Sequence, residues 1–158
     1  MKSGYVSSRF TDIENAISKA RLAASGISDP EVAAYFARYL AVFTCGVYED
    51  CIEHLFVERA GQANDEKIIT FMTSTMHLSF RNPNYETIKS HLCRFDTQNG
   101  EKLNNLLKPE QIEAINSIKN NKDQVAHGQP CSATILDIES YHGRIKEMFE
   151  IIEQILGL

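Results

Sequence analysis

Apolar and polar residues follow a helical period along almost the whole chain. Apolar positions recur every three or four residues, as on one face of a helix. No segment keeps the strict alternation of apolar and polar residues that a half-buried strand shows over about six positions. The pattern therefore predicts an all-α fold.

The first helix is predicted from about Thr11 to Ala24. Ile13, Ile17 and Leu22 fall on its inward face. Gly26 follows the last periodic residue, where glycine commonly ends a helix.

A second and much longer helix is predicted to begin at Ser28 or Asp29 and to run to about Ala60. Pro30 falls in its first turn, where a missing N–H does no harm. At 1.5 Å per residue such a helix is roughly 45 Å long, which makes it the expected spine of a bundle. Gly46 in its middle predicts that another helix crosses closely there.

Shorter helices are predicted over residues 66–77, 84–95, 101–107 and 109–126, and a long one over 134–156. The last begins with Thr134 and Asp137 at the spacing of a capping box. Its apolar residues form a heptad-like seam, suited to antiparallel packing in a bundle or to a second subunit. We therefore predict an up-and-down helical bundle with one long central helix and short accessory helices.

Composition agrees with one globular domain over residues 1–158, with its core at about 12–156. The chain of 158 residues is 43% hydrophobic and 23% charged, with only 8 Gly and 4 Pro. Its net charge of −5 is opposite to the basic footprint of a nucleic-acid-binding protein. Any contact with RNA therefore needs a local basic patch. Arg81, Arg94, Lys119 and Lys122 are candidates for it, the alternative being four scattered, solvated charges.

The cysteine pattern predicts reduced thiols in a cytoplasmic protein. Four cysteines form neither a dense disulfide framework nor paired CxxC motifs. Cys51 and His54 could form half of a metal site, but no second half with strong spacing exists, so we expect no metal and no cofactor. No apolar leader opens the chain and no segment approaches the ~18 apolar residues of a membrane span, so neither secretion nor membrane insertion is expected.

The most informative segment ends the helix predicted over 109–126. The apolar stripe of Ile115 and Ile118 continues to positions 122 and 125, so Lys122 occupies a place where the pattern requires an apolar residue. Either the lysine stem packs while the amine reaches solvent, or this face of the helix lines a polar groove in which a cation is needed.

His127 stands at the end of the same helix and also has two interpretations. It can cap the helix, with its ring bonded to the last carbonyl groups. It can equally act as a general acid or base. Five residues of straight helix separate the directions of Lys122 and His127 by roughly 140°. The two side chains therefore meet one ligand only if the helix unwinds at Gly128 or a second chain completes the groove.

Residues 121–128, Asn-Lys-Asp-Gln-Val-Ala-His-Gly, resemble the signature of HEPN domains (higher eukaryotes and prokaryotes nucleotide-binding), usually R-N-x-I-A-H-G at a helix end. Three earlier segments resemble successive landmarks of the RiboL-PSP-HEPN group: residues 29–43, the Gly-Val-Tyr-Glu of 46–49, and the Arg-Asn-Pro-Asn of 81–84 with Phe95. Their order and spacing agree with that group. The resemblance covers roughly residues 12–155.

This resemblance implies a homodimeric all-α bundle in which the R-x4-6-H motifs of two protomers face one another across a cleft. Many members of the family are metal-independent endoribonucleases that act as toxins or in defence against phage. The RNA 2′-hydroxyl attacks the adjacent phosphate and leaves a 2′,3′-cyclic phosphate and a 5′-hydroxyl. The expected partners are RNA, a second copy, and an antitoxin or defence-system protein.

Carried over to this chain, the resemblance makes His127 the general acid or base and places Lys122 where the family has arginine. Asp123 stands where asparagine is usual, and Asn121 and Glu49 are the candidates for substrate binding. Glu49 can instead brace the signature helix, by a hydrogen bond or by pairing with a cation such as Lys122, or be a solvated surface residue. Lysine cannot clamp a phosphate bidentately, and a neighbouring carboxylate repels phosphate. The K-x4-H motif therefore leaves open an alternative, a catalytically inactive HEPN module that dimerises or binds RNA or another ligand.

Overall fold

A computed structural model describes residues 1–26 and 29–158 of the chain. In these residues it contains seven α-helices and no strand, which confirms the predicted all-α class. The helices are α1 (Gly4–Ser25), α2 (Pro30–Gly61), α3 (Glu66–Ser79), α4 (Tyr85–Phe95), α5 (Asn99–Leu106), α6 (Pro109–Ala126) and α7 (Ile135–Leu156).

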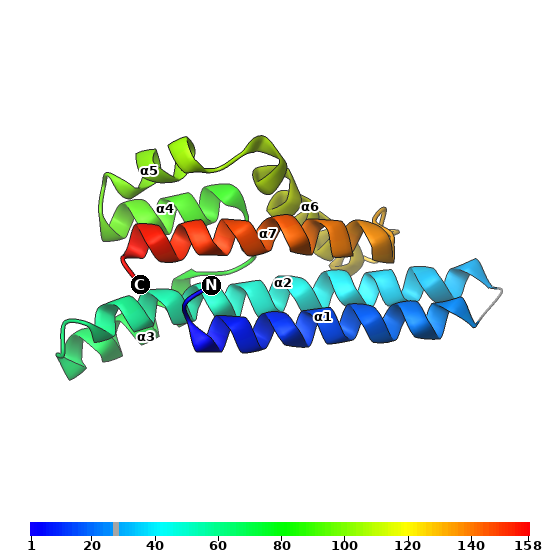
Figure 1. The fold of residues 1–158 in the computed structure, drawn as a ribbon, viewed down its shortest axis with the longest axis horizontal. Helices are drawn as coiled ribbons and strands as arrows, with labels where there is room; N and C mark the ends of the chain where they lie inside the picture. Colours follow the sequence, from blue (N-terminus) through cyan, green and yellow to red (C-terminus); the bar gives the residue numbers. More distant parts are fainter. Residues whose placement is uncertain (27–28) are drawn as a thin grey trace.

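The long helix α2 is the spine of the bundle, as predicted. Helices α1 and α2 run antiparallel side by side, and α7 packs along both (Figure 1). Helix α6 packs against α2 and α7, so that the segment carrying the signature lies on the spine. The short helices α4 and α5 cover one end of α7, and α3 extends from the C-terminal end of α2 (Figure 1).

Helix α1 begins at Gly4, about seven residues before the predicted start at Thr11. A contact distant in sequence causes the difference. The buried carboxylate of Glu153 accepts hydrogen bonds of 2.7 and 3.0 Å from the backbone N–H groups of Lys2 and Ser3. Because two free donors at the helix start are satisfied in this way, the first turn is ordered without a local capping side chain.

The inward face of α1 also begins earlier and ends earlier than predicted. Val6 and Phe10 are fully buried together with Ile13 and Ile17. The assignment of Leu22 to this face is wrong, because its side chain is 77% exposed.

Helix α2 is capped by Asp29, whose side chain accepts a hydrogen bond from the N–H of Glu31. This agrees with one of the two predicted starts; Ser28 lies outside the described residues. The expectation that another helix crosses closely at Gly46 is wrong for the residues that the structure describes. Gly46 is exposed, and a Cβ atom added there would meet none of their atoms within 4 Å.

The apolar seam of α7 packs inside the bundle. Ile138, Ile145, Met148 and Ile152 are fully buried. The predicted capping box at its start is present, since Thr134 and Asp137 each satisfy the backbone N–H of the other. The seam therefore packs against other helices of the same chain.

No described helix has the length and apolar content needed to cross a membrane.

Candidate functional site

The site is built on the C-terminal end of α6, and the predicted break at Gly128 is confirmed. Gly128 has φ +69°, in the left-handed region that glycine adopts without a steric penalty. The N–H of His127 donates to the carbonyl of Asp123 (3.0 Å), and the N–H of Gly128 donates to that of Val125 (3.1 Å). His127 is therefore the C-cap residue of α6, immediately before the chain turns at Gly128.

The side chain of His127 is exposed and free for chemistry. Its ring makes no hydrogen bond or ion pair with any residue that the structure describes, the last carbonyl groups of α6 included. An exposed imidazole without such a partner is a group suited to general acid–base catalysis. The geometry is thus compatible with the acid–base interpretation of this residue.

Lys122 lies where two elements meet. Its side chain is 26% exposed, and its Nζ donates a hydrogen bond of 2.6 Å to Oδ1 of Asn82, in the connection between α3 and α4. A longer contact of 3.4 Å joins the same Nζ to Oδ1 of Asp123. The ammonium therefore lies between the α3–α4 connection and α6, in contact with an amide and a carboxylate.

Asp123 is paired mainly with Lys119, one turn earlier on α6. Their Oδ2 and Nζ atoms are 2.7 Å apart. The hydrogen bond from Lys119 is the largest cause that lowers the pKa of Asp123, and Lys122 adds a smaller effect. The carboxylate is therefore negatively charged at neutral pH, and its nearest cation is Lys119.

Asn121 is buried and supports the segment that follows His127. Its Oδ1 accepts hydrogen bonds from the backbone N–H groups of Ser132 (3.1 Å) and Ala133 (3.0 Å), and its Nδ2 donates to the carbonyl of Ser117 (2.8 Å). A contact between this side chain and a substrate would require the loop over residues 128–134 to be released. In the structure, Asn121 fixes that loop rather than facing solvent.

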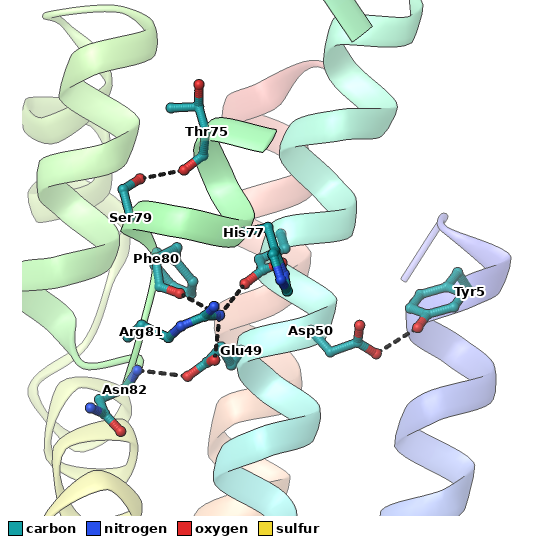
Figure 2. A network of polar contacts seen from close by, with 10 residues as sticks. Tyr5, Glu49, Asp50, Thr75, His77, Ser79, Phe80, Arg81 and Asn82 are labelled. Carbon is teal, nitrogen blue, oxygen red and sulfur yellow. Dashed lines mark hydrogen bonds and ion pairs between the residues drawn. The ribbon is translucent and has the colours of Figure 1, made fainter. Parts of the chain in front are cut away.

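Glu49 reaches the signature through the α3–α4 connection. Figure 2 shows its carboxylate between the guanidinium of Arg81 and the backbone N–H of Asn82. The distances are 3.1 Å to Nη1 of Arg81 and 2.7 Å to the N–H of Asn82. Arg81 also pairs with Glu53 at 3.2 Å. Glu49 therefore braces the signature helix indirectly, through the residue that holds Lys122.

Three of the four cations that are candidates for a basic patch are paired with carboxylates. Arg81, Lys119 and Lys122 are each in contact with a carboxylate, and Arg94 is on α4. Among the described residues, no group of three or more His, Cys, Asp or Glu side chains could hold a metal ion. Cys51 is buried, and burial raises its pKa to about 12, so its thiol is a poor nucleophile at neutral pH.

The signature of residues 121–128 stands at a helix end in an all-α bundle. A family model, RiboL-PSP-HEPN, matches residues 6–157 of the chain. The chain belongs to the RiboL-PSP-HEPN family. No curated protein and no solved structure matches it in the same comparisons. HEPN domains commonly dimerise.

Asn82 is the residue of this HEPN site that sequence reasoning missed. In the sequence, Asn82 stands out only as part of the Arg-Asn-Pro-Asn landmark of residues 81–84. One signal was available, since asparagine tolerates the left-handed backbone that Asn82 adopts, with φ 53°. The contact with Lys122 spans 40 positions, and no local pattern predicts it.

Proposed function

We propose that this HEPN protein is a metal-independent endoribonuclease. The observation that carries the proposal is the state of His127, which is exposed and without an internal partner at the end of α6, five positions after a lysine held in place by Asn82. A purely structural histidine at a helix end would be expected to bond the last carbonyl groups. Here the ring is left available for proton transfer.

The reaction is an internal transfer of the phosphate. The 2′-oxygen of the RNA loses its proton to a general base and forms a bond to the adjacent phosphorus. The bond from phosphorus to the 5′-oxygen breaks, and a general acid gives that oxygen a proton. The products are a 2′,3′-cyclic phosphate and a 5′-hydroxyl. His127 supplies proton transfer, and Lys122 stabilises the negative charge that develops on the phosphate oxygens.

A dimer supplies the second proton-transfer group. One protomer has a single signature histidine, whereas the reaction uses both a base and an acid. Tyr39, Val42 and Gly46 lie at helical spacing on the exposed part of α2, and Glu49 follows in the same series. Tyr39 is 57% and Val42 is 42% exposed. A second copy seated on this stripe would lie beside the signature, and Gly46 would allow its close approach.

The biological role that we propose is that of a toxin or a phage-defence effector acting in the cytoplasm. The resemblance to HEPN toxins supports the role, and the four free cysteines are compatible with a reducing compartment. An antitoxin or another protein of the defence system would then be its partner.

A second candidate function is a catalytically inactive HEPN module that dimerises or binds RNA. The observation that favours it is the 3.4 Å contact between Lys122 and Asp123, because a carboxylate at this place repels a phosphate. The two functions differ in their response to Lys122→Arg. In an inactive module the folded wild-type dimer cleaves no RNA and Lys122→Arg restores cleavage, whereas in an active enzyme the wild-type protein already cleaves.

Incubation of the purified protein with total tRNA and with a structured RNA, in EDTA, tests the proposed activity. We expect cleavage without metal, products that end in 2′,3′-cyclic phosphate and 5′-hydroxyl, and a dimer in light scattering. Cleavage that needs a divalent ion, or products with 3′-hydroxyl ends, would overturn the mechanism. A strictly monomeric protein that cleaves would overturn the shared cleft.

A further inference from the structure

The connection between α3 and α4 extends to the signature on α6. Its residue Asn82 accepts the 2.6 Å hydrogen bond from Nζ of Lys122. The backbone of Asn82 has φ 53°, which most side chains adopt at a cost and which asparagine tolerates. Asparagine therefore suits this position in two ways, through its tolerance of the backbone conformation and through its side-chain amide.

Glu49 holds Asn82 in that position. Oε2 of Glu49 accepts the N–H of Asn82, and Oε1 accepts the guanidinium of Arg81, so both carboxylate oxygens bind adjacent residues of the connection (Figure 2). Glu53 binds the same guanidinium from one turn further along α2. The connection is therefore anchored on the spine of the bundle, and the amide of Asn82 is left to face Lys122.

The choice of an amide has an electrostatic consequence. A neutral amide oxygen orients an ammonium group without cancelling its charge, whereas a carboxylate would neutralise it. The carboxylate next to Lys122 belongs to Asp123, and its shorter contact is to Lys119, at 2.7 Å against 3.4 Å. Lys119 is thus the nearer partner of Asp123, and the shortest hydrogen bond of the Lys122 amine, at 2.6 Å, is to an amide that carries no charge.

We propose that Asn82, held by Glu49, is a positioning residue for Lys122, and that Lys119 screens Asp123, so that Lys122 keeps its charge for a phosphate of the substrate. This inference rests on the proposed ribonuclease function and adds the α3–α4 connection to its site. It also explains how a lysine followed by an aspartate can occupy the place of the arginine and asparagine in the usual HEPN signature.

Two substitutions of Asn82 separate its roles. Asn82→Gly keeps a residue suited to φ 53° and removes the amide, whereas Asn82→Asp keeps the shape and adds a charge. Reductive methylation measures the availability of the Lys122 amine, with Lys19 as reference because it is exposed and makes no hydrogen bond or ion pair in the described part of the chain. We expect methylation of Lys122 to become roughly fivefold faster in Asn82→Gly, which frees the amine, and slower in Asn82→Asp, which holds it charged.

The same variants are tested for RNA cleavage in EDTA. Both should lower kcat by about tenfold, because one loses the position of Lys122 and the other its charge. Glu49→Gln should also speed methylation of Lys122 and lower kcat, but by less than Asn82→Gly does. An amide at position 49 holds the α3–α4 connection less strongly than a carboxylate. Circular dichroism checks that each variant is folded, and if Asn82→Gly fails this check, Asn82→Asp and Glu49→Gln carry the test.

The two readouts keep the two proposals apart. Unchanged methylation of Lys122 in both folded Asn82 variants, or full cleavage by them, would overturn the positioning role. Methylation that shifts in opposite directions, together with a wild-type protein that cleaves no RNA, would support the positioning of Lys122 and overturn the ribonuclease function. Opposite shifts with reduced cleavage in both variants are the result that we expect.

Discussion

The hydroxyl of Tyr48 and Nδ1 of His142 share a 2.8 Å hydrogen bond in the centre of the bundle, although they are 94 positions apart. Tyr48 is fully buried and His142 is 4% exposed. The hydroxyl has no other hydrogen-bond partner in the described chain, so we assign the tautomer in which it donates to Nδ1 and the ring carries its own proton on Nε2, 4.0 Å from Oε1 of Glu14. This arrangement requires a neutral imidazole.

The pH dependence of stability should therefore report on His142. Burial is the main cause that lowers its pKa to about 4, from 6.5 for a free histidine. Because the unfolded chain binds this proton more readily, stability is present above pH 6.5 and is lost as the pH falls from about 6.5 toward 4, by about 3 kcal/mol at most. Urea unfolding at several pH values measures the slope.

The control for this prediction replaces both partners together. A Tyr48→Phe, His142→Phe double variant removes the titration and leaves no orphaned polar atom, so its stability should change less between pH 6.5 and 4. Carboxylates whose pKa is lowered in the fold, such as Asp123 and Asp137, still destabilise both proteins at lower pH. An equal slope in the two proteins over this range would show that His142 does not titrate as described.

Asn121→Ala should destabilise the protein and release the loop after His127. The substitution leaves the N–H groups of Ser132 and Ala133 without their acceptor, at a cost of about 2–3 kcal/mol. Asn120→Ala is the matched control, because that neighbouring asparagine is exposed and makes no side-chain hydrogen bond in the described chain. Urea unfolding gives the free energies, and hydrogen exchange should become faster at residues 128–134 only in Asn121→Ala.

Gly46→Ala should stabilise an isolated protomer. The glycine lies inside α2, is exposed, and leaves room for a methyl group. Alanine is favoured there by about 0.5–1 kcal/mol, because it loses less backbone freedom on folding. Gly46→Arg tests the proposed dimer face: we expect a folded protein that is monomeric in light scattering. An unperturbed dimer would place the interface elsewhere.

Lys119→Met should lower RNA cleavage by roughly five- to tenfold, because Asp123 then turns its charge toward Lys122. Adding Asp123→Asn to this variant should restore the rate, since the charge that needed screening is gone. Single-turnover cleavage of one RNA by the three proteins measures the effect. Failure of the second substitution to rescue the first would mean that Lys119 acts in another way.

The parts of the fold that depend on local signals could be predicted from the sequence. Helices α2, α6 and α7 begin at residues that favour a helix start through their own backbone geometry or side chains, namely Asp29, Pro109 and Thr134. The start of α1 could not be predicted, because it depends on the carboxylate of Glu153, 150 positions away. Interactions of this kind arise only when the bundle is formed.

The candidate site divides in the same way. His127 and the break at Gly128 are properties of one short segment, and both were visible in the sequence. The environment of Lys122 was not, because Asn82 and Glu49 come from a connection and a helix far away in the chain. A cation at an apolar position of a helical stripe indicated only that a polar neighbour exists.

The rate of RNA cleavage by His127→Ala in EDTA tests the central claim most directly. His127 is exposed and makes no side-chain contact that the fold needs, so the variant should unfold like the wild type while cleavage falls by about 10²–10⁴-fold. His54→Ala, which removes a histidine from α2, should retain cleavage. Cleavage by His127→Ala at the wild-type rate would contradict the account.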